Sequence, residues 1–78
     1  MRKKEKKIII TFTTTTEAIQ MEKCCKKERM PGRLIPIPTA ITAGCGLSWC
    51  IYPDEKEIVL AMMDRAGLNP EGVYELVI

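Results

Sequence analysis

The sequence predicts an α+β domain in which two helices cover one face of a four-stranded antiparallel sheet. Three observations lead to this prediction: the segments follow the order β-α-β-β-α-β, the first strand is apolar on both faces, and prolines interrupt the second strand. A strand that is apolar on both faces belongs in the middle of a sheet, and a strand with prolines belongs at an edge. Right-handed crossovers make the first two strands parallel, which gives the strand order 4-1-3-2 of the ferredoxin-like arrangement.

The first half of the chain contains two strands and the helix between them. Residues 7–13 are β-branched and aromatic, which is typical of a strand. Thr14 to Glu17 matches a capping box, so a helix is expected from this point to about Glu28, with Pro31-Gly32 ending it. Residues 33–38 then form the second strand, with its prolines at the sheet edge.

The second half repeats this order. Residues 47–52 form the third strand, and Asp54 with Glu57 matches a second capping box. The next helix is expected from about residue 55 to residue 66, where Gly67 ends it, and residues 73–78 form the last strand. The apolar side chains that this helix is expected to bury are Ile58, Val59, Met62 and Ala66.

Composition and charge narrow the range of partners. The 78 residues are expected to form a basic N-terminal tail, residues 1–6, and one domain, residues 7–78. The net charge is only +2, and no aromatic residues are interleaved with the basic tail, so we expect no nucleic-acid partner. No apolar run is long enough for a signal-peptide core or a membrane span, so we expect a cytoplasmic protein without a membrane partner. In that compartment the four cysteines stay reduced.

Cys45 is the candidate functional residue. It stands between Gly44 and Gly46, and flanking glycines let the backbone adopt positive φ and let a partner approach the sulfur. A thiolate is both a nucleophile and a soft ligand, so this setting suggests thiol chemistry. The alternative is that Cys45 fills a small apolar gap in a tight turn, as buried free cysteines often do.

The predicted topology places Cys45 near the start of the first helix, because the ends of the first two strands meet at the same end of the sheet. A helix N-terminus presents unpaired amides and a partial positive charge, which favour a thiolate or another anion. The groups expected to stabilise the sulfur or an anion bound to it are the backbone amides of Gly44 and Gly46 and the hydroxyls of Thr14, Thr15, Thr16 and Thr42.

The remaining cysteines suggest less chemistry. Cys24 and Cys25 are expected to pack as small apolar groups on the first helix. Cys50 is expected either in the core or as a resolving thiol for Cys45. The sequence has no histidine and no CxxC pair, so we expect neither a metal site nor a cofactor.

Several segments resemble a family of small bacterial proteins described as selenium/sulfur carrier-like. The resemblance runs from about Ile8 to the C-terminus, and its most specific part is the Pro-x-Pro run followed by a threonine and then Cys-Gly. Members of this family often carry an arginine directly after the second proline, where this chain has Thr39. The segments that carry the resemblance are Phe12–Thr15, Glu17-Ala18 with Glu22, Arg33–Pro38 and Ile41–Leu47.

Three functions follow from these observations. The resemblance implies that Cys45 holds sulfur or selenium as a persulfide or selenosulfide, between a donor protein and an acceptor protein that would perform any catalysis. The second reading is a structural or interaction module, in which the sheet face that carries Ile9 and Thr11, or a sheet edge, forms a homodimer. The third is a thiol redox element, in which Cys50 resolves an oxidised Cys45.

Overall fold

The computed structural model describes residues 4–42 and 44–78. These residues form four strands, two helices and one 3-10 turn, in the order β1 (Lys6–Thr11), α1 (Thr15–Glu28), β2 (Arg33–Pro36), β3 (Leu47–Ile51), η1 (Pro53–Glu55), α2 (Lys56–Ala66) and β4 (Gly72–Val77). All three strand pairs are antiparallel, and the sheet order is β2-β3-β1-β4. Read from the other edge, this is the predicted order, with β1 inside and the proline-bearing β2 at an edge.

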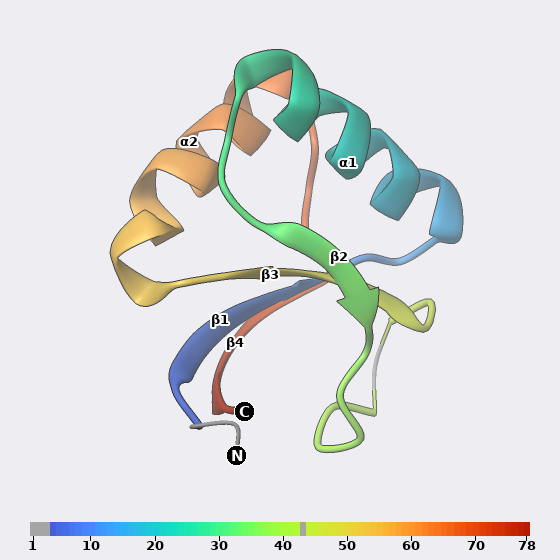
Figure 1. The fold of residues 1–78 in the computed structure, drawn as a ribbon. Coiled ribbons are helices and arrows are strands. Elements are labelled where there is room, and N and C mark those ends of the chain that lie inside the picture. The colour runs from blue at the N-terminus through green and yellow to red at the C-terminus, as the bar shows by residue number, and fades with distance from the viewer. Residues whose placement is uncertain (1–3, 43) are drawn as a thin grey trace.

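Both helices lie on the same side of the sheet (Figure 1). The side chains that face them alternate along β1, at Ile8 and Ile10, and continue at Phe12 just after the strand; all three are at most 2% exposed. Trp49 and Ile51 of β3 belong to the same core. Its helical members are Ala18, Met21 and Cys25 of α1 and Val59, Met62 and Met63 of α2.

A second, smaller core lies on the other side of the sheet. Ile9 of β1 and Cys50 of β3 are cross-strand partners there, and Ile41, from the loop between β2 and β3, packs on them. Ile9 is fully buried in this cluster; Thr11 is also fully buried, and its hydroxyl donates a hydrogen bond of 2.7 Å to Glu71. The centre of the face that was expected to meet a partner is covered by the chain itself.

α1 ends at Glu28 as predicted, but the residue that caps it differs from the prediction. The helix stops at Glu28, and Arg29 caps it in the left-handed region with φ 55°. Met30 N–H then donates to the Cys25 carbonyl at 2.8 Å, which completes the cap. Gly32 does not end the helix: it lies beneath the Trp49 indole, where a Cβ atom would collide with the ring.

The start and the buried face of α2 also differ from the prediction. The predicted capping box of Asp54 and Glu57 is wrong: the carboxylate of Glu55 accepts the Tyr52 N–H at 2.9 Å and stabilises the preceding turn η1. Ile58 is 51% exposed and Ala66 is also exposed, while Met63 joins Val59 and Met62 in the core. Residues 58–63 are uninterruptedly apolar, so their periodicity alone does not define a buried face.

The N-terminal segment takes part in the sheet. β1 begins at Lys6, and Glu5 exchanges two backbone hydrogen bonds of 3.0 Å with Ile78, so the pairing with the last strand extends into the segment predicted as a tail. Of that segment, residues 1–3 lie outside the described residues. Within the described part of the chain, the longest apolar helical stretch falls short of what a bilayer crossing requires.

Candidate functional site

The loop between β2 and β3 carries Cys45 and folds back toward the sheet. Ile37 N–H donates to the Gly46 carbonyl at 2.9 Å, which closes the loop at its base, and Ile41 N–H donates to the Pro38 carbonyl at 3.0 Å. Burial of Ile41 against Ile9 holds the middle of the loop on the face opposite the helices, while Cys45 near its end packs against the helix-side core. These contacts fix the position of the Cys45 turn.

The glycines on either side of Cys45 both have positive φ, as the sequence suggested. Gly44 and Gly46 each have φ 97°, a conformation that residues with a Cβ rarely adopt. A Cβ atom on Gly44 would stand only 3.3 Å from the Phe12 carbonyl oxygen and 3.4 Å from Thr11, so the loop approaches β1 closely at this point. Gly46 has open space around it.

A backbone hydrogen bond joins Cys45 to the segment that leads from β1 into α1. Cys45 N–H donates to the Phe12 carbonyl at 3.0 Å, two residues before the α1 cap Thr14. Cys45 is half-buried, packs against the helix-side core, and directs its Sγ toward the Leu47 carbonyl at 3.8 Å. Cys45 therefore lies beside the entry to α1, where the strand order placed it.

The threonines at this end of the molecule are engaged differently. The Thr14 hydroxyl accepts the Glu17 N–H at 3.2 Å, and the Glu17 carboxylate accepts the Thr14 N–H at 3.1 Å, so the predicted capping box is present. Thr15, Thr16 and Thr42 are exposed, and the hydrogen bonds of the described residues include none from their side chains to Cys45. The Glu17 carboxylate offsets part of the partial positive charge at the N-terminus of α1. This end of the helix therefore attracts an anion at Cys45 less strongly.

Cys24 and Cys25 occupy the positions expected of packing groups. Cys25 is 2% exposed in the helix-side core, and Cys24 is half-buried against the same core. Burial, together with the neighbouring Cys24, raises the pKa of Cys25 to about 11. Cys25 is therefore a neutral thiol at physiological pH and a poor nucleophile.

Cys45 and Cys50 are not brought together. Cys50 faces Ile9 and Ile41 on the side of the sheet away from the helices, whereas Cys45 packs against the helix-side core. Three further side chains that the sequence analysis did not single out surround Cys50: Lys7, Arg33 and Tyr52. The alternation of side chains along β1, β2 and β3 indicates which residues share a sheet face. It does not show which of them lie next to Cys50, because that depends on the strand register.

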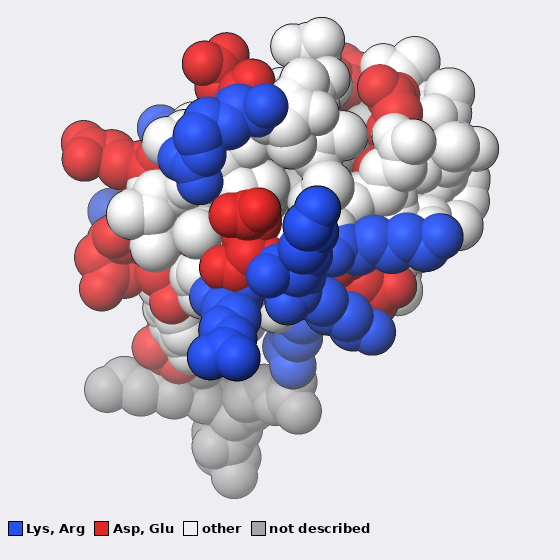
Figure 2. All heavy atoms as spheres, turned by 90° about the horizontal axis from the view of Figure 1, so that it is seen from above, with Lys and Arg blue, Asp and Glu red and all other residues white. Residues whose placement is uncertain are grey.

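The outer surface over the helices carries both signs of charge. Figure 2 shows Lys and Arg side chains interspersed with Asp and Glu on this side, rather than a face of a single sign. In residues 4–42 and 44–78, no three His, Cys, Asp or Glu side chains are grouped closely enough to hold a metal ion. The site is therefore defined by the Cys45 thiol and the backbone around it.

Comparison with known protein families relates this chain to one of them. No curated protein matches the chain. A family model described as "Putative Se/S carrier protein-like" matches residues 7–75, which include both helices, the Cys45 turn and nearly all of the sheet. The match covers far more than half of the 78 residues, so the chain belongs to this selenium/sulfur carrier-like family.

Proposed function

We propose that the protein carries sulfur or selenium on Cys45 and delivers it to an acceptor protein in the cytoplasm. The observation that carries this proposal is the position of Cys45: of the four cysteines, it alone lies in a loop, half-exposed and held by a glycine turn at the entry to α1. Family membership supports the class of cargo. The strand order and the two helices on one face support a ferredoxin-like arrangement as the scaffold.

Loading and delivery are both exchanges that need no separate oxidant. The Cys45 thiolate attacks the outer sulfur of a donor persulfide, R–S–SH; a new S–S bond forms, and the donor thiolate leaves with the electron pair of the old bond. Cys45 then holds a persulfide. An acceptor nucleophile attacks the terminal sulfur, and the Cys45 thiolate is released. A donor with S–Se in place of S–S would load selenium by the same steps.

The backbone around Cys45 suits such a step. A Cβ atom added to Gly46, the residue after Cys45, would have no heavy atom within 4 Å apart from its chain neighbours, so the turn is open on that side. The glycines leave room for an acceptor to reach the terminal sulfur. The Cys45 N–H is already bonded to Phe12, so it fixes the turn, and the anion must find its hydrogen bonds elsewhere.

The proposal is tested by loading the reduced protein from a small-molecule persulfide donor and mapping the adduct by mass spectrometry. We expect one added sulfur on Cys45 and its loss when a thiol acceptor is added. Cys45→Ser should abolish this adduct. Cys24→Ser is the matched control, because it also removes one half-buried thiol but should leave the loading of Cys45 unchanged.

The fold of the Cys45→Ser variant is checked by circular dichroism and urea unfolding. Loading that persists in a folded Cys45→Ser protein would disprove the assignment. Labelling of Cys24 and Cys45 to the same extent would show that the turn gives Cys45 no advantage and would also count against a carrier.

A second candidate is self-association through the β4 edge of the sheet. Val77 is 59% exposed and Ile78 is 42% exposed on this edge, and Val73 is also exposed. Edge strands offer unpaired backbone groups to a second copy. Sedimentation equilibrium of the wild type and of Val77→Lys tests this: a dimer that the lysine variant dissociates supports it, and a wild-type monomer at all concentrations rejects it.

A further inference from the structure

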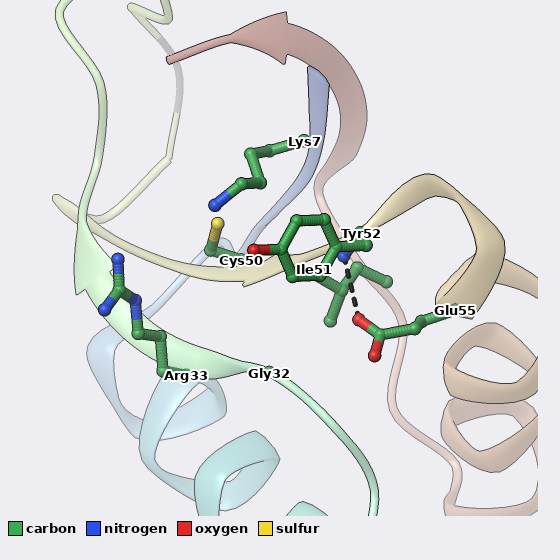
Figure 3. A pocket seen from close by; sticks show the side chains of 7 residues that line it. All are labelled: Lys7, Gly32, Arg33, Cys50, Ile51, Tyr52 and Glu55. Atoms are coloured by element: carbon green, nitrogen blue, oxygen red, sulfur yellow. Dashed lines mark hydrogen bonds between the residues drawn. The ribbon is translucent and has the colours of Figure 1, made fainter. Parts of the chain in front are cut away.

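A pocket of about 290 Å³ opens beside Cys50, well away from the Cys45 turn. Its walls bring together a thiol, two cations and a phenol, from Cys50, Lys7, Arg33 and Tyr52. Figure 3 shows the Cys50 sulfur pointing toward the Lys7 ammonium group, with the Arg33 guanidinium on the side of β2. The family assignment and the Cys45 proposal leave this cluster without a role.

The strand register explains why these side chains meet. Arg33 and Cys50 are direct cross-strand partners between β2 and β3, so their side chains share one sheet face. Ile9 is the partner of Cys50 on β1, and Lys7 lies two residues before Ile9 on the same face. The Lys7 ammonium lies 4.6 Å from the centre of the Tyr52 ring, which holds it over the pocket.

The charge of the pocket is positive. The two ion pairs among the described residues are Lys6–Glu75 and Arg65–Glu28, so within this part of the chain neither Lys7 nor Arg33 is paired. One carboxylate, that of Glu55, also lines the pocket, where it accepts the Tyr52 N–H. In Figure 3 it lies on the far side of the Tyr52 ring from both cations. A small anion therefore has two cations available near Cys50.

Access to the Cys50 sulfur is narrow. The residue is 6% exposed and packs on Ile9 and Ile41 beneath the pocket. A reagent must therefore enter the pocket to reach the thiol, and it passes Lys7 and Arg33 as it does so. Partly accessible thiols in electropositive surroundings are the reactive ones in proteins.

We propose that Cys50 is a modification site, at which small carboxylate-bearing disulfides bind between Lys7 and Arg33 and form a mixed disulfide. The Cys50 thiolate attacks one sulfur of R–S–S–R; a Cys50–S–S–R bond forms, and R–S⁻ leaves with the electron pair of the broken bond. The step needs no oxidant besides the disulfide itself. This site goes beyond the carrier proposal and does not depend on it.

The test compares two disulfides of similar size in a Cys45→Ser background, which removes the proposed carrier thiol. Dithiodipropionate carries two carboxylates, and hydroxyethyl disulfide is neutral. Rates of adduct formation at each cysteine are followed by peptide-mapped mass spectrometry of the folded protein. We expect Cys50 to show a higher ratio of anionic to neutral rate than the same residue in urea-unfolded protein.

Charge-neutralising variants locate the cause. Lys7→Gln combined with Arg33→Gln should lower the rate with dithiodipropionate by roughly fivefold to tenfold, as expected for the loss of two nearby charges in a hydrated site, and leave the neutral rate unchanged. Lys6→Gln combined with Lys56→Gln is the matched control: it removes the same total charge from exposed positions that do not line the pocket.

A second measurement requires no variant beyond Cys45→Ser. Raising the salt concentration should reduce the anionic rate at Cys50 and spare the neutral rate, because exposed charges are screened. Equal effects of the two double variants would overturn the proposal. So would a folded protein in which Cys50 reacts with neither disulfide. Because all these assays lack Cys45, their failure leaves the carrier proposal untouched, and failure of Cys45 loading leaves this site untouched.

Discussion

The neighbouring cysteines of α1 differ in burial: Cys25 is buried in the core, whereas Cys24 is half-buried. Cys25 is 2% exposed among Met21, Trp49 and other core side chains, and its pKa is raised from 9.0 to about 11, first by burial and then by the nearby Cys24. The cause is that water stabilises a thiolate and the core does not. Ionisation of Cys25 therefore makes the stability of the domain depend on pH in the alkaline range.

We predict that stability falls between about pH 9 and pH 11 because of Cys25. The folded protein holds the Cys25 proton more tightly than the unfolded chain does, so its contribution is fully present below pH 9 and is lost as the pH rises through about 11. The shift corresponds to roughly 2–3 kcal/mol of unfolding free energy. Urea unfolding of wild type and Cys25→Ala across this range measures it.

Lysine and tyrosine side chains also titrate in this pH range, but they are the same in wild type and Cys25→Ala. The difference between the unfolding free energies of the two proteins therefore reports on Cys25. Cys25→Ala should be less stable at neutral pH, because it leaves a small cavity, and it should lose less stability on the way to pH 11. Cys24→Ala serves as the control on the same helix. Parallel pH profiles for wild type and Cys25→Ala would show that burial of this thiol does not set the alkaline limit.

At the scale of elements, the turn that carries Cys45 depends on two glycines for different reasons. Gly44 combines φ 97° with a close approach to Phe12 and Thr11, whereas Gly46 has the same φ in open space. An L-residue at positive φ costs about 1–2 kcal/mol. We therefore predict that Gly46→Ala destabilises the domain by roughly that amount and that Gly44→Ala costs clearly more.

Unfolding midpoints of the two variants in urea measure this difference. Both substitutions add one methyl group, at positions two residues apart. The two variants therefore control for each other, because they differ only in where the methyl group is placed. Equal destabilisation, or a larger effect at Gly46, would mean that the contact with Phe12 does not hold the turn in place.

Element boundaries show where the sequence is informative and where it is not. The Thr14–Glu17 capping box predicts the start of α1 because both partners are local, and the structure has it. The end of α1 at Glu28 was also predicted, but its cap was not, since Arg29 adopts a left-handed conformation that its residue type does not favour. The buried face of α2 was unpredictable because six consecutive apolar residues, 58–63, offer no periodicity.

At the scale of the whole molecule, the strand order was predictable because it rests on two strong cues. β1 is apolar on both faces and lies inside the sheet, and β2 carries Pro36 and lies at an edge. This order was enough to place Cys45 beside the start of α1. It was not enough to bring Lys7 and Arg33 to Cys50, because that requires the register of three strands, and a shift of one residue reverses every side chain.

The same topology separates Cys45 from Cys50 and leads to a prediction about oxidation. Cys45 is held at Phe12, and Cys50 pairs with Ile9, three residues along the same chain segment, which corresponds to about 10 Å in an extended strand. A disulfide needs Cα atoms within about 7 Å. We predict that mild oxidation with diamide forms no Cys45–Cys50 disulfide in the folded protein.

Non-reducing digestion and mass spectrometry would detect the link, and urea-unfolded protein should form it because the chain between the two cysteines is then free. Rapid formation in the folded state would require the Cys45 turn to leave Phe12 and swing to the opposite face of the sheet, which would revive a resolving role for Cys50.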